Sequence, residues 1–397
     1  MKSVLVNKKN EQLIVCVLEN GKISEKYIFS NTTDNLLGNI YACKVDKIVE
    51  GMQAAFVDIG KEKKAFISVK DALPKVDVVT EKQSQNGKMS FVLNEGQPLL
   101  AQVKKEPTDE KGARISTHIT LPGKYIVLMP ETNIITISQK IEDDTEKQRL
   151  KELVKSNLEE NYGAIVRTEA ENIGEESIKE DIKTLFELWQ DIKNQYEKDN
   201  SVRLIYSGYE VIDFITRELV NKDTNKLYIN DKTIFEKIRD DLTTIDTEFY
   251  DEDLLEKFGL VTEYSKIEDR KVWLKCGGQI VIDKTEALTA IDINSSKFTG
   301  KEDLEATIFK VNSEAAVEIM RQLRLKDIGG IIVIDFIDMK NEEHKEKILE
   351  ILKKEAKKDR SRVSIHEFTK LNLVEMTRKK VHSTTNNWQM KLICYNN

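Results

Sequence analysis

The sequence has 397 residues, of which 40% are apolar and 33% are charged, and its formal net charge is −7 at pH 7. This length exceeds one ordinary hydrophobic core and predicts roughly two to four structural units, with the composition of a soluble globular protein. No apolar run approaches the ~20 residues of a membrane helix, and the opening residues lack the pattern of a signal peptide. We therefore expect a cytoplasmic protein without a membrane span.

Several chemical classes are disfavoured by what the sequence lacks. The four cysteines, at positions 16, 43, 276 and 394, lie far apart and form no CxxC pair. A disulfide framework and a self-contained zinc site are therefore not expected. The strings GxxxxGK[ST], GxGxxG and HExxH do not occur, which argues against nucleotide-driven and zinc-protease mechanisms. Residues 340–380 are locally basic, which is typical of a solvated helix or of a polyanion-binding surface.

Strand patterns dominate the first third of the chain. Residues 1–35 contain alternating apolar runs, and the pair Asn20–Gly21 between two of them is typical of a β-hairpin turn. Short alternating strands continue through residues 38–118 and predict a small closed barrel. We expect the polar stretch 71–90 to form a loop within this barrel.

Aromatic residues lie among lysines in the predicted barrel. They are Tyr41, Phe56 and Phe66. Barrels of this kind stack single-stranded bases on aromatic rings, and their lysines attract the phosphate backbone. Two interpretations stay open from the pattern alone: the rings bind nucleic acid, or they fill the barrel core.

The middle of the chain changes to helical spacing. Residues 143–160 and 174–199 repeat apolar side chains with the period of a helix, and residues 163–170 between them predict a short strand. A strand at 225–230 and a helix at 231–242 follow. These patterns predict compact α+β structure, and no internal repeat is evident.

The last third carries the pattern that bears on chemistry. Strands are predicted at 277–283, 285–295 and 329–339, with an amphipathic helix at 302–327 before the last one. A strand–helix–strand unit of this length makes a right-handed crossover between parallel strands. The carboxyl ends of those strands then share one edge of the sheet, where ligands favour binding. Asp292 and Asp335 lie at these ends.

Two carboxylates brought within a few ångströms repel each other unless a cation lies between them. Oxygen ligands suit Mg²⁺ or Mn²⁺, and Asn294 adds a neutral oxygen on the same strand face as Asp292. A magnesium ion that keeps several waters fits phosphodiester hydrolysis. The alternative, from spacing alone, is that these aspartates cap helices or turns.

At these residues the sequence resembles the ribonuclease E/G family of endoribonucleases. The segments GGQIVIDKTEALTAIDINS, RQLRLKDIGGIIVIDFIDM and DRSRVSIHEFTKLNLVEMTRKK are similar to the catalytic segments of that family, in unbroken order. GNIY, AAFVDIG, VKKEPTDEKGARIST, PGKYIVLMP and IVRTEA are similar to its upstream segments. The resemblance covers nearly the whole chain.

The resemblance implies cleavage of single-stranded, AU-rich RNA to leave 5′-phosphate and 3′-hydroxyl ends, in rRNA and tRNA processing and mRNA decay. It implies that Asp292 and Asp335 are catalytic magnesium ligands and that the catalytic residue Asn294 supports their site. The implied RNA-binding residues are Phe56, Phe66, Lys105 and Lys111. The implied pocket for a 5′-monophosphate consists of Gly123, Val127, Arg167 and Thr168.

An α+β multidomain fold is also implied. The expected parts are a ribonuclease-H-like subdomain split between 1–37 and 208–266, an OB-fold RNA-binding domain of the ribosomal-protein type at 38–118, an α+β 5′-monophosphate sensor at 119–207, and a DNase-I-like α/β catalytic subdomain at 267–397.

The sequence departs from the family at its zinc motif. Members often carry a CxxC pair beyond the catalytic domain, through which two chains share one zinc ion. Here Cys394 matches the first thiol and the second is missing. One thiolate from each of two chains makes a poor tetrahedral zinc site, so we do not expect zinc, and a homodimer stays open. The rival interpretation is a non-catalytic or weakly active RNA-binding homologue, and a metal-dependent DNase is disfavoured.

Overall fold

A computed structural model describes residues 2–30, 36–72, 92–108, 111–208, 211–241, 245–295 and 304–379. Within these residues the chain forms two compact units, one from 2–30 with 222–379 and one from 36–221. The predicted loop at 71–90 lies outside the described residues except for its first two positions, and Cys394 lies outside them as well. Among the helices described, none has both the length and the hydropathy of a membrane span.

A five-stranded sheet in the first unit joins segments from distant parts of the sequence. Its strand order is β15-β14-β1-β2-β3, and β1 and β14 are parallel neighbours. The strands are β1 (Lys2–Lys9), β2 (Gln12–Glu19), β3 (Lys22–Ser30), β14 (Thr224–Ile229) and β15 (Asp246–Phe249). Asn20 and Gly21 link β2 to β3 with φ angles of 51° and 77°. Two positive φ angles are typical of a type I′ hairpin turn, so the predicted turn is confirmed.

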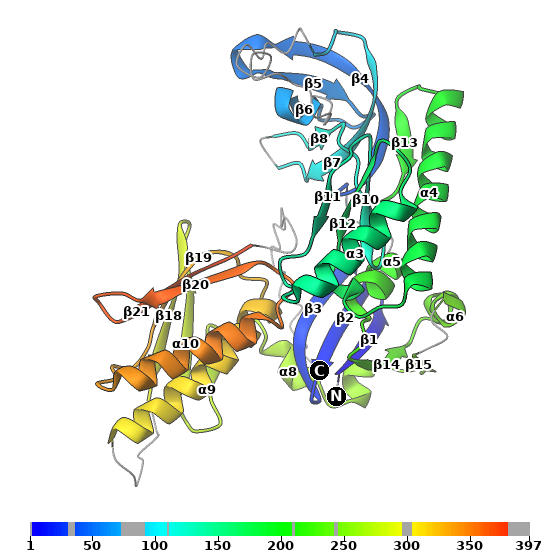
Figure 1. Cartoon of the computed structure of the whole chain (residues 1–397). Coiled ribbons are helices and arrows are strands. Elements are labelled where there is room, and N and C mark those ends of the chain that lie inside the picture. The colour runs from blue at the N-terminus through cyan, green and yellow to red at the C-terminus, as the bar shows by residue number, and fades with distance from the viewer. Residues whose placement is uncertain are drawn as a thin grey trace. The chain divides into compact units, whose positions relative to one another are not determined.

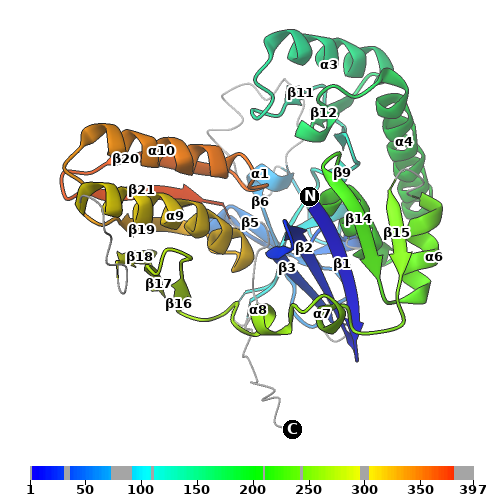
Figure 2. The ribbon, with the colours of Figure 1, turned by 90° about the horizontal axis from the view of Figure 1, so that it is seen from below.

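A six-stranded sheet forms the rest of this unit, in the order β16-β17-β18-β19-β21-β20. The strands are β16 (Lys271–Trp273), β17 (Gln279–Lys284), β18 (Leu288–Asn294), β19 (Gly330–Asp335), β20 (Val363–Phe368) and β21 (Leu373–Arg378). Figure 1 and Figure 2 show α9 (Leu304–Leu325) and α10 (Glu342–Ala356) side by side along this sheet. Isoleucines of β18 and β19 pack with both helices in one buried core. The predicted parallel pairing of β18 with β19 through a crossover helix is confirmed.

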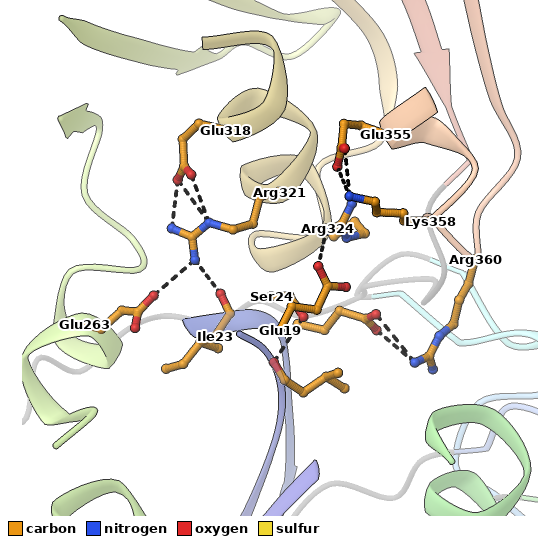
Figure 3. A network of polar contacts seen from close by, with 12 residues as sticks. Glu19, Ile23, Ser24, Glu263, Glu318, Arg321, Arg324, Glu355, Lys358 and Arg360 are labelled. Carbon is orange, nitrogen blue, oxygen red and sulfur yellow. Dashed lines mark hydrogen bonds and ion pairs between the residues drawn. The ribbon is translucent and has the colours of Figure 1, made fainter. Parts of the chain in front are cut away.

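Arginines on α9 connect the helix to the first sheet of the same unit (Figure 3). Arg321 Nη1 donates a hydrogen bond to the carbonyl of Ile23 and another, at 3.1 Å, to Glu263 on α8 (Val261–Ser265). Arg324, whose side chain is only 3% exposed, lies 3.4 Å from Glu19. Breaking a buried ion pair leaves an uncompensated charge and is strongly destabilising. These contacts therefore fix α9 against the β2–β3 hairpin.

The second unit contains the predicted barrel. Its strands are β4 (Ile40–Val49), β5 (Ala54–Asp58), β6 (Ala65–Ser68), β7 (Pro98–Lys105) and β8 (Arg114–Ser116). They close into a ring because β4 pairs with β5 and also with β7. A closed five-stranded barrel is consistent with an OB fold. Tyr41 is buried in the barrel core, so the core interpretation holds for this ring.

A four-stranded sheet, β11-β12-β10-β9, completes the second unit together with helices. These elements are β9 (Leu121–Pro122), β10 (Ile126–Pro130), β11 (Ile135–Ile137), α3 (Asp144–Asn157), β12 (Tyr162–Val166), α4 (Glu175–Lys198), α5 (Val211–Phe214) and the π-helix η4 (Ile215–Leu219). One more strand, β13 (Arg203–Tyr206), pairs with β4 of the barrel. Isoleucines and leucines of the sheet, α3 and α4 share one core. The strand predicted at 163–170 was too long, because β12 ends at Val166 and a 3₁₀ turn, η3 (Thr168–Ala170), follows.

Candidate active site

The ends of β18 and β19 bring two carboxylates together. Asp292 and Asp335 are direct partners in the parallel ladder, where neighbouring strands lie about 4.8 Å apart. Alternation along each strand turns Ile291, Ile293 and Ile334 into the core that α9 and α10 cover, so the aspartates lie on the opposite, exposed face. Two acids on one exposed strand edge form a concentrated negative site.

Asn294 reinforces this site from two residues further along β18. Its Nδ2 donates a hydrogen bond to Oδ2 of Asp292 at 2.6 Å. We expected Asn294 to offer a neutral oxygen, but its amide nitrogen is the group that faces the carboxylate. The contact holds the carboxylate of Asp292 in one orientation.

Electrostatics at this edge favour a bound cation. Burial, together with the negative charges of Asp292 and Asp338, raises the pKa of Asp335. Asp338, three residues after Asp335 in the string DFID, was considered only as a capping residue, and its effect on Asp335 was not foreseen. The described residues contain no cluster of three or more His, Cys, Asp or Glu side chains arranged for a metal. A divalent ion held by Asp292 and Asp335 would therefore keep several waters, which fits the ligand preference of Mg²⁺.

The barrel carries a row of aromatic and basic side chains across neighbouring strands. Lys47 pairs with Phe56, Phe56 with Phe66, Phe66 with Arg114, and Arg114 with Lys105. The rings of Phe56 and Phe66 meet edge to face at 6.3 Å between centroids, and Phe56 is 36% exposed. Exposed rings flanked by cations suit single-stranded nucleic acid.

Sequence reasoning found part of this row and missed one member. Lys47 was among the lysines expected beside the rings, whereas Arg114 was not predicted, and strand register is the information that places both in line with the rings. Arg114 also forms hydrogen bonds of 2.9 and 2.7 Å to Asp71. Lys111, which was predicted, is exposed in the segment before β8 and lies outside the row.

Carboxylates already contact Arg167, the cation expected to bind a 5′-phosphate. Arg167 Nη1 donates to the carbonyl of Gly123 at 2.8 Å, and Nη1 and Nη2 donate to Glu218 at 2.7 Å each. Oε2 of Glu169 lies 3.6 Å from Nε. Burial alone would lower the pKa of Arg167, but hydrogen bonding to Glu218 and the neighbouring acidic charges raise it instead.

The backbone beside Arg167 is engaged by an acid as well. Asp181, on α4, accepts hydrogen bonds from the N–H groups of residues 124, 125 and 126 at 2.8 to 3.0 Å. Thr168 Oγ1 lies 2.8 Å from Ser138 Oγ. Val127, on β10, is partly buried and pairs with Pro122. The four predicted pocket residues therefore gather at one end of this sheet, and the acids around them were not foreseen.

Comparison with known proteins gives the family. The model of the "Ribonuclease E/G family" matches residues 120–381. The chain is 36% identical to Ribonuclease G of Escherichia coli K12 over 392 residues, which cover 96% of this chain and 80% of that protein. Ribonuclease G of Haemophilus influenzae is equally similar, and Ribonuclease E of Buchnera aphidicola is 35% identical over 97% of this chain and 41% of its own length. The family match and these identities agree with the order of motifs along the sequence, and the chain belongs to the ribonuclease E/G family.

Proposed function

We propose that this chain cleaves single-stranded RNA with a divalent metal, Mg²⁺ or Mn²⁺, held by Asp292 and Asp335. Family membership makes the chain an endoribonuclease and therefore a hydrolase. The single observation that carries the proposed site is the register that places Asp292 beside Asp335 on an exposed sheet face. A bound ion of this kind supplies an activated water and neutralises charge on the scissile phosphate.

The chain's own residues would divide the remaining work. Asp292 and Asp335 bind the ion, and Asn294 holds Asp292 in one orientation through its 2.6 Å hydrogen bond. Phe56 and Phe66 would stack bases, and the flanking lysines and Arg114 would attract the backbone. The proposed net reaction adds water across the P–O3′ bond of a phosphodiester, so one product carries a 3′-hydroxyl and the other a 5′-phosphate.

The pocket around Arg167 is the proposed receptor for a 5′-monophosphate. A guanidinium recognises a terminal phosphate through paired N–H groups. On the family resemblance we also propose a preference for AU-rich sequence, roles in rRNA and tRNA processing and mRNA decay, and a cytoplasmic location. These proposals are independent of the chemistry proposed for Asp292 and Asp335. They can be wrong while that chemistry is right.

A gel assay tests the central claim. A 5′-labelled single-stranded RNA is incubated with the protein in Mg²⁺, in EDTA, and in EDTA followed by excess Mg²⁺. We expect internal cleavage in the first and third conditions only. Cleavage that persists in EDTA would contradict metal dependence. Binding without cleavage in Mg²⁺ would instead favour the non-catalytic homologue, and equal cleavage of the matching DNA would contradict the RNA specificity.

A further inference from the structure

The guanidinium of Arg167 has two edges that differ in their partners. It carries five N–H donors in a planar fork. The Nη1 group donates to Gly123 O and to Glu218, and Nη2 donates to the other oxygen of Glu218. These three bonds account for the edge formed by Nη1 and Nη2. The Nε–H and the second Nη2 hydrogen form the other edge.

On that second edge, the contact made by the described part of the chain is a weak one. Oε2 of Glu169 lies 3.6 Å from Nε, which is too far for a hydrogen bond. A guanidinium edge with two parallel N–H groups is the geometry that binds phosphate bidentately. Arg167 is 16% exposed, whereas the side chains of Glu169 and Glu218 are 32% and 33% exposed. The acid beside the available edge can therefore swing toward water while the guanidinium stays in place.

We propose that Glu218 is a positioning residue that presents the Nε–Nη2 edge of Arg167, and that Glu169 competes with an incoming 5′-phosphate for that edge. The inference rests on the proposed 5′-monophosphate pocket and adds the residues that set its selectivity. Glu218, from η4, accepts hydrogen bonds from both Nη1 and Nη2 of Arg167. Because rotation of the guanidinium would break one of these two bonds, the contact fixes its orientation. Glu169, two residues after Arg167, lies where the ligand would bind.

Charge explains why the two glutamates act in opposite directions. A terminal phosphate carries a charge of about −1.5 to −2 at neutral pH. Glu169 repels this charge at the binding edge, so the phosphate binds only when that carboxylate moves aside. Glu218 adds repulsion too, but its loss also frees the guanidinium to rotate. Shortening Glu218 while keeping its charge therefore isolates its positioning role.

The experiment measures binding of the full chain to two RNA oligonucleotides that differ only in a 5′-phosphate or a 5′-hydroxyl. Both are 2′-O-methylated, labelled at the 3′ end, used in Mg²⁺ and checked by gel to stay intact. The readout is the ratio of the two Kd values by fluorescence anisotropy. We expect Glu169→Gln to raise the preference for the phosphate about threefold, the effect of removing one partly screened like charge.

Glu218→Asp should lower the same preference about fivefold, because the shorter carboxylate cannot keep both charge-assisted hydrogen bonds. Affinity for the 5′-hydroxyl RNA should not change, which separates loss of positioning from loss of folding. Glu176→Gln is the matched control for Glu169→Gln. It removes one negative charge from a side chain that is 91% exposed and pairs with Lys179, and it should leave the ratio unchanged.

Two outcomes would overturn the inference. They are an unchanged Kd ratio in Glu169→Gln and an unchanged Kd ratio in Glu218→Asp, which includes the case where both RNA ends shift equally. If the Kd ratio were one in the wild type and in every variant, both the proposed 5′-monophosphate pocket and this inference would be wrong. Cleavage of RNA in Mg²⁺ would still stand in that case. If the protein did not cleave RNA but its preference for the 5′-phosphate changed in the variants as expected, the proposed nuclease site would be wrong. The inference about Glu169 and Glu218 would still be supported.

Discussion

The two polar sites of this chain differ in whether the protein supplies the opposite charge. At the β18–β19 edge, the charges that act on Asp335 are other carboxylates, Asp292 and Asp338. At Arg167, one guanidinium lies among Glu218, Glu169 and the nearby charge of Asp181. A cation from outside would relieve the repulsion at the first site, in line with the metal proposed there. The second already has its counter-charges, so a ligand must compete for it.

This difference predicts how each site responds to mutation. A site that depends on an added cation should fail almost completely when one ligand is removed. A site where a ligand competes with internal acids should respond by degrees, because the protein itself already supplies part of the interaction. The expected effects below run from the largest to the smallest.

Asp335→Asn should reduce cleavage of single-stranded RNA by about 10³-fold or more, because it removes a ligand of the proposed ion. Initial rates in Mg²⁺, with RNA affinity measured in parallel, check the result, and affinity should be retained. Glu375→Gln is the control, since Glu375 is exposed on the same sheet face, opposite Val333. A variant of Asp335 with wild-type turnover would contradict the assignment.

Asn294→Ala should lower the rate by about 10- to 100-fold, the usual cost of losing a residue that orients a metal ligand. Part of this loss should be recovered at high Mg²⁺, because the carboxylates remain. The measurement is a titration of the cleavage rate with Mg²⁺. A loss as deep as that of Asp335→Asn, with no recovery, would make Asn294 more than an orienting residue.

Arg167→Ala should reduce the advantage of 5′-monophosphorylated over 5′-hydroxyl RNA by about tenfold, the effect of lost hydrogen bonds to a charged group. The rate on 5′-hydroxyl RNA should stay near that of the wild type. Competition between the two substrates in one reaction gives this ratio directly. Equal rates on both ends in the wild type would contradict the proposed sensor.

The smallest expected effect is on stability. Mg²⁺ at about ten times its Kd should stabilise the wild type by roughly 1.4 kcal/mol. Asp335→Asn should show little of this stabilisation, whereas Arg167→Ala should keep it. Thermal melts with and without Mg²⁺ check the difference. Equal stabilisation of all three proteins would place the ion elsewhere.

The sequence predicts one of these sites better than the other for a physical reason. Alternating isoleucines and the helix at 302–327 determine the β18–α9–β19 unit, and local periodicity then places Asp292 beside Asp335. No local pattern brings Glu218 to Arg167, since 51 residues separate them. Asp181 is likewise an ordinary polar position on an amphipathic helix until tertiary structure places it over residues 124–126. Local hydrophobic periodicity carries no information about such contacts between distant segments.

Strand ends were predicted less well than strand cores. The segment GAIVRTEA was predicted as one strand through Ala170, but the chain leaves the sheet after Val166. Arg167 still donates its backbone N–H to the carbonyl of Tyr125, and its side chain reaches Gly123. Polar contacts of this residue decide where it lies, and hydrophobic periodicity carries no information about them.

The parallel pairing of β1 with β14 has a consequence for synthesis on the ribosome. Lys2 donates its backbone N–H to Asn225, 223 positions later. At about 5–20 residues per second, roughly 10–45 s separate the translation of these two residues. The β1–β2 hairpin therefore has its β1 edge unpaired while the ribosome synthesises the whole barrel-containing unit. A nascent chain stalled before Thr224 should expose that edge to chaperones, and one released after Phe249 can close it.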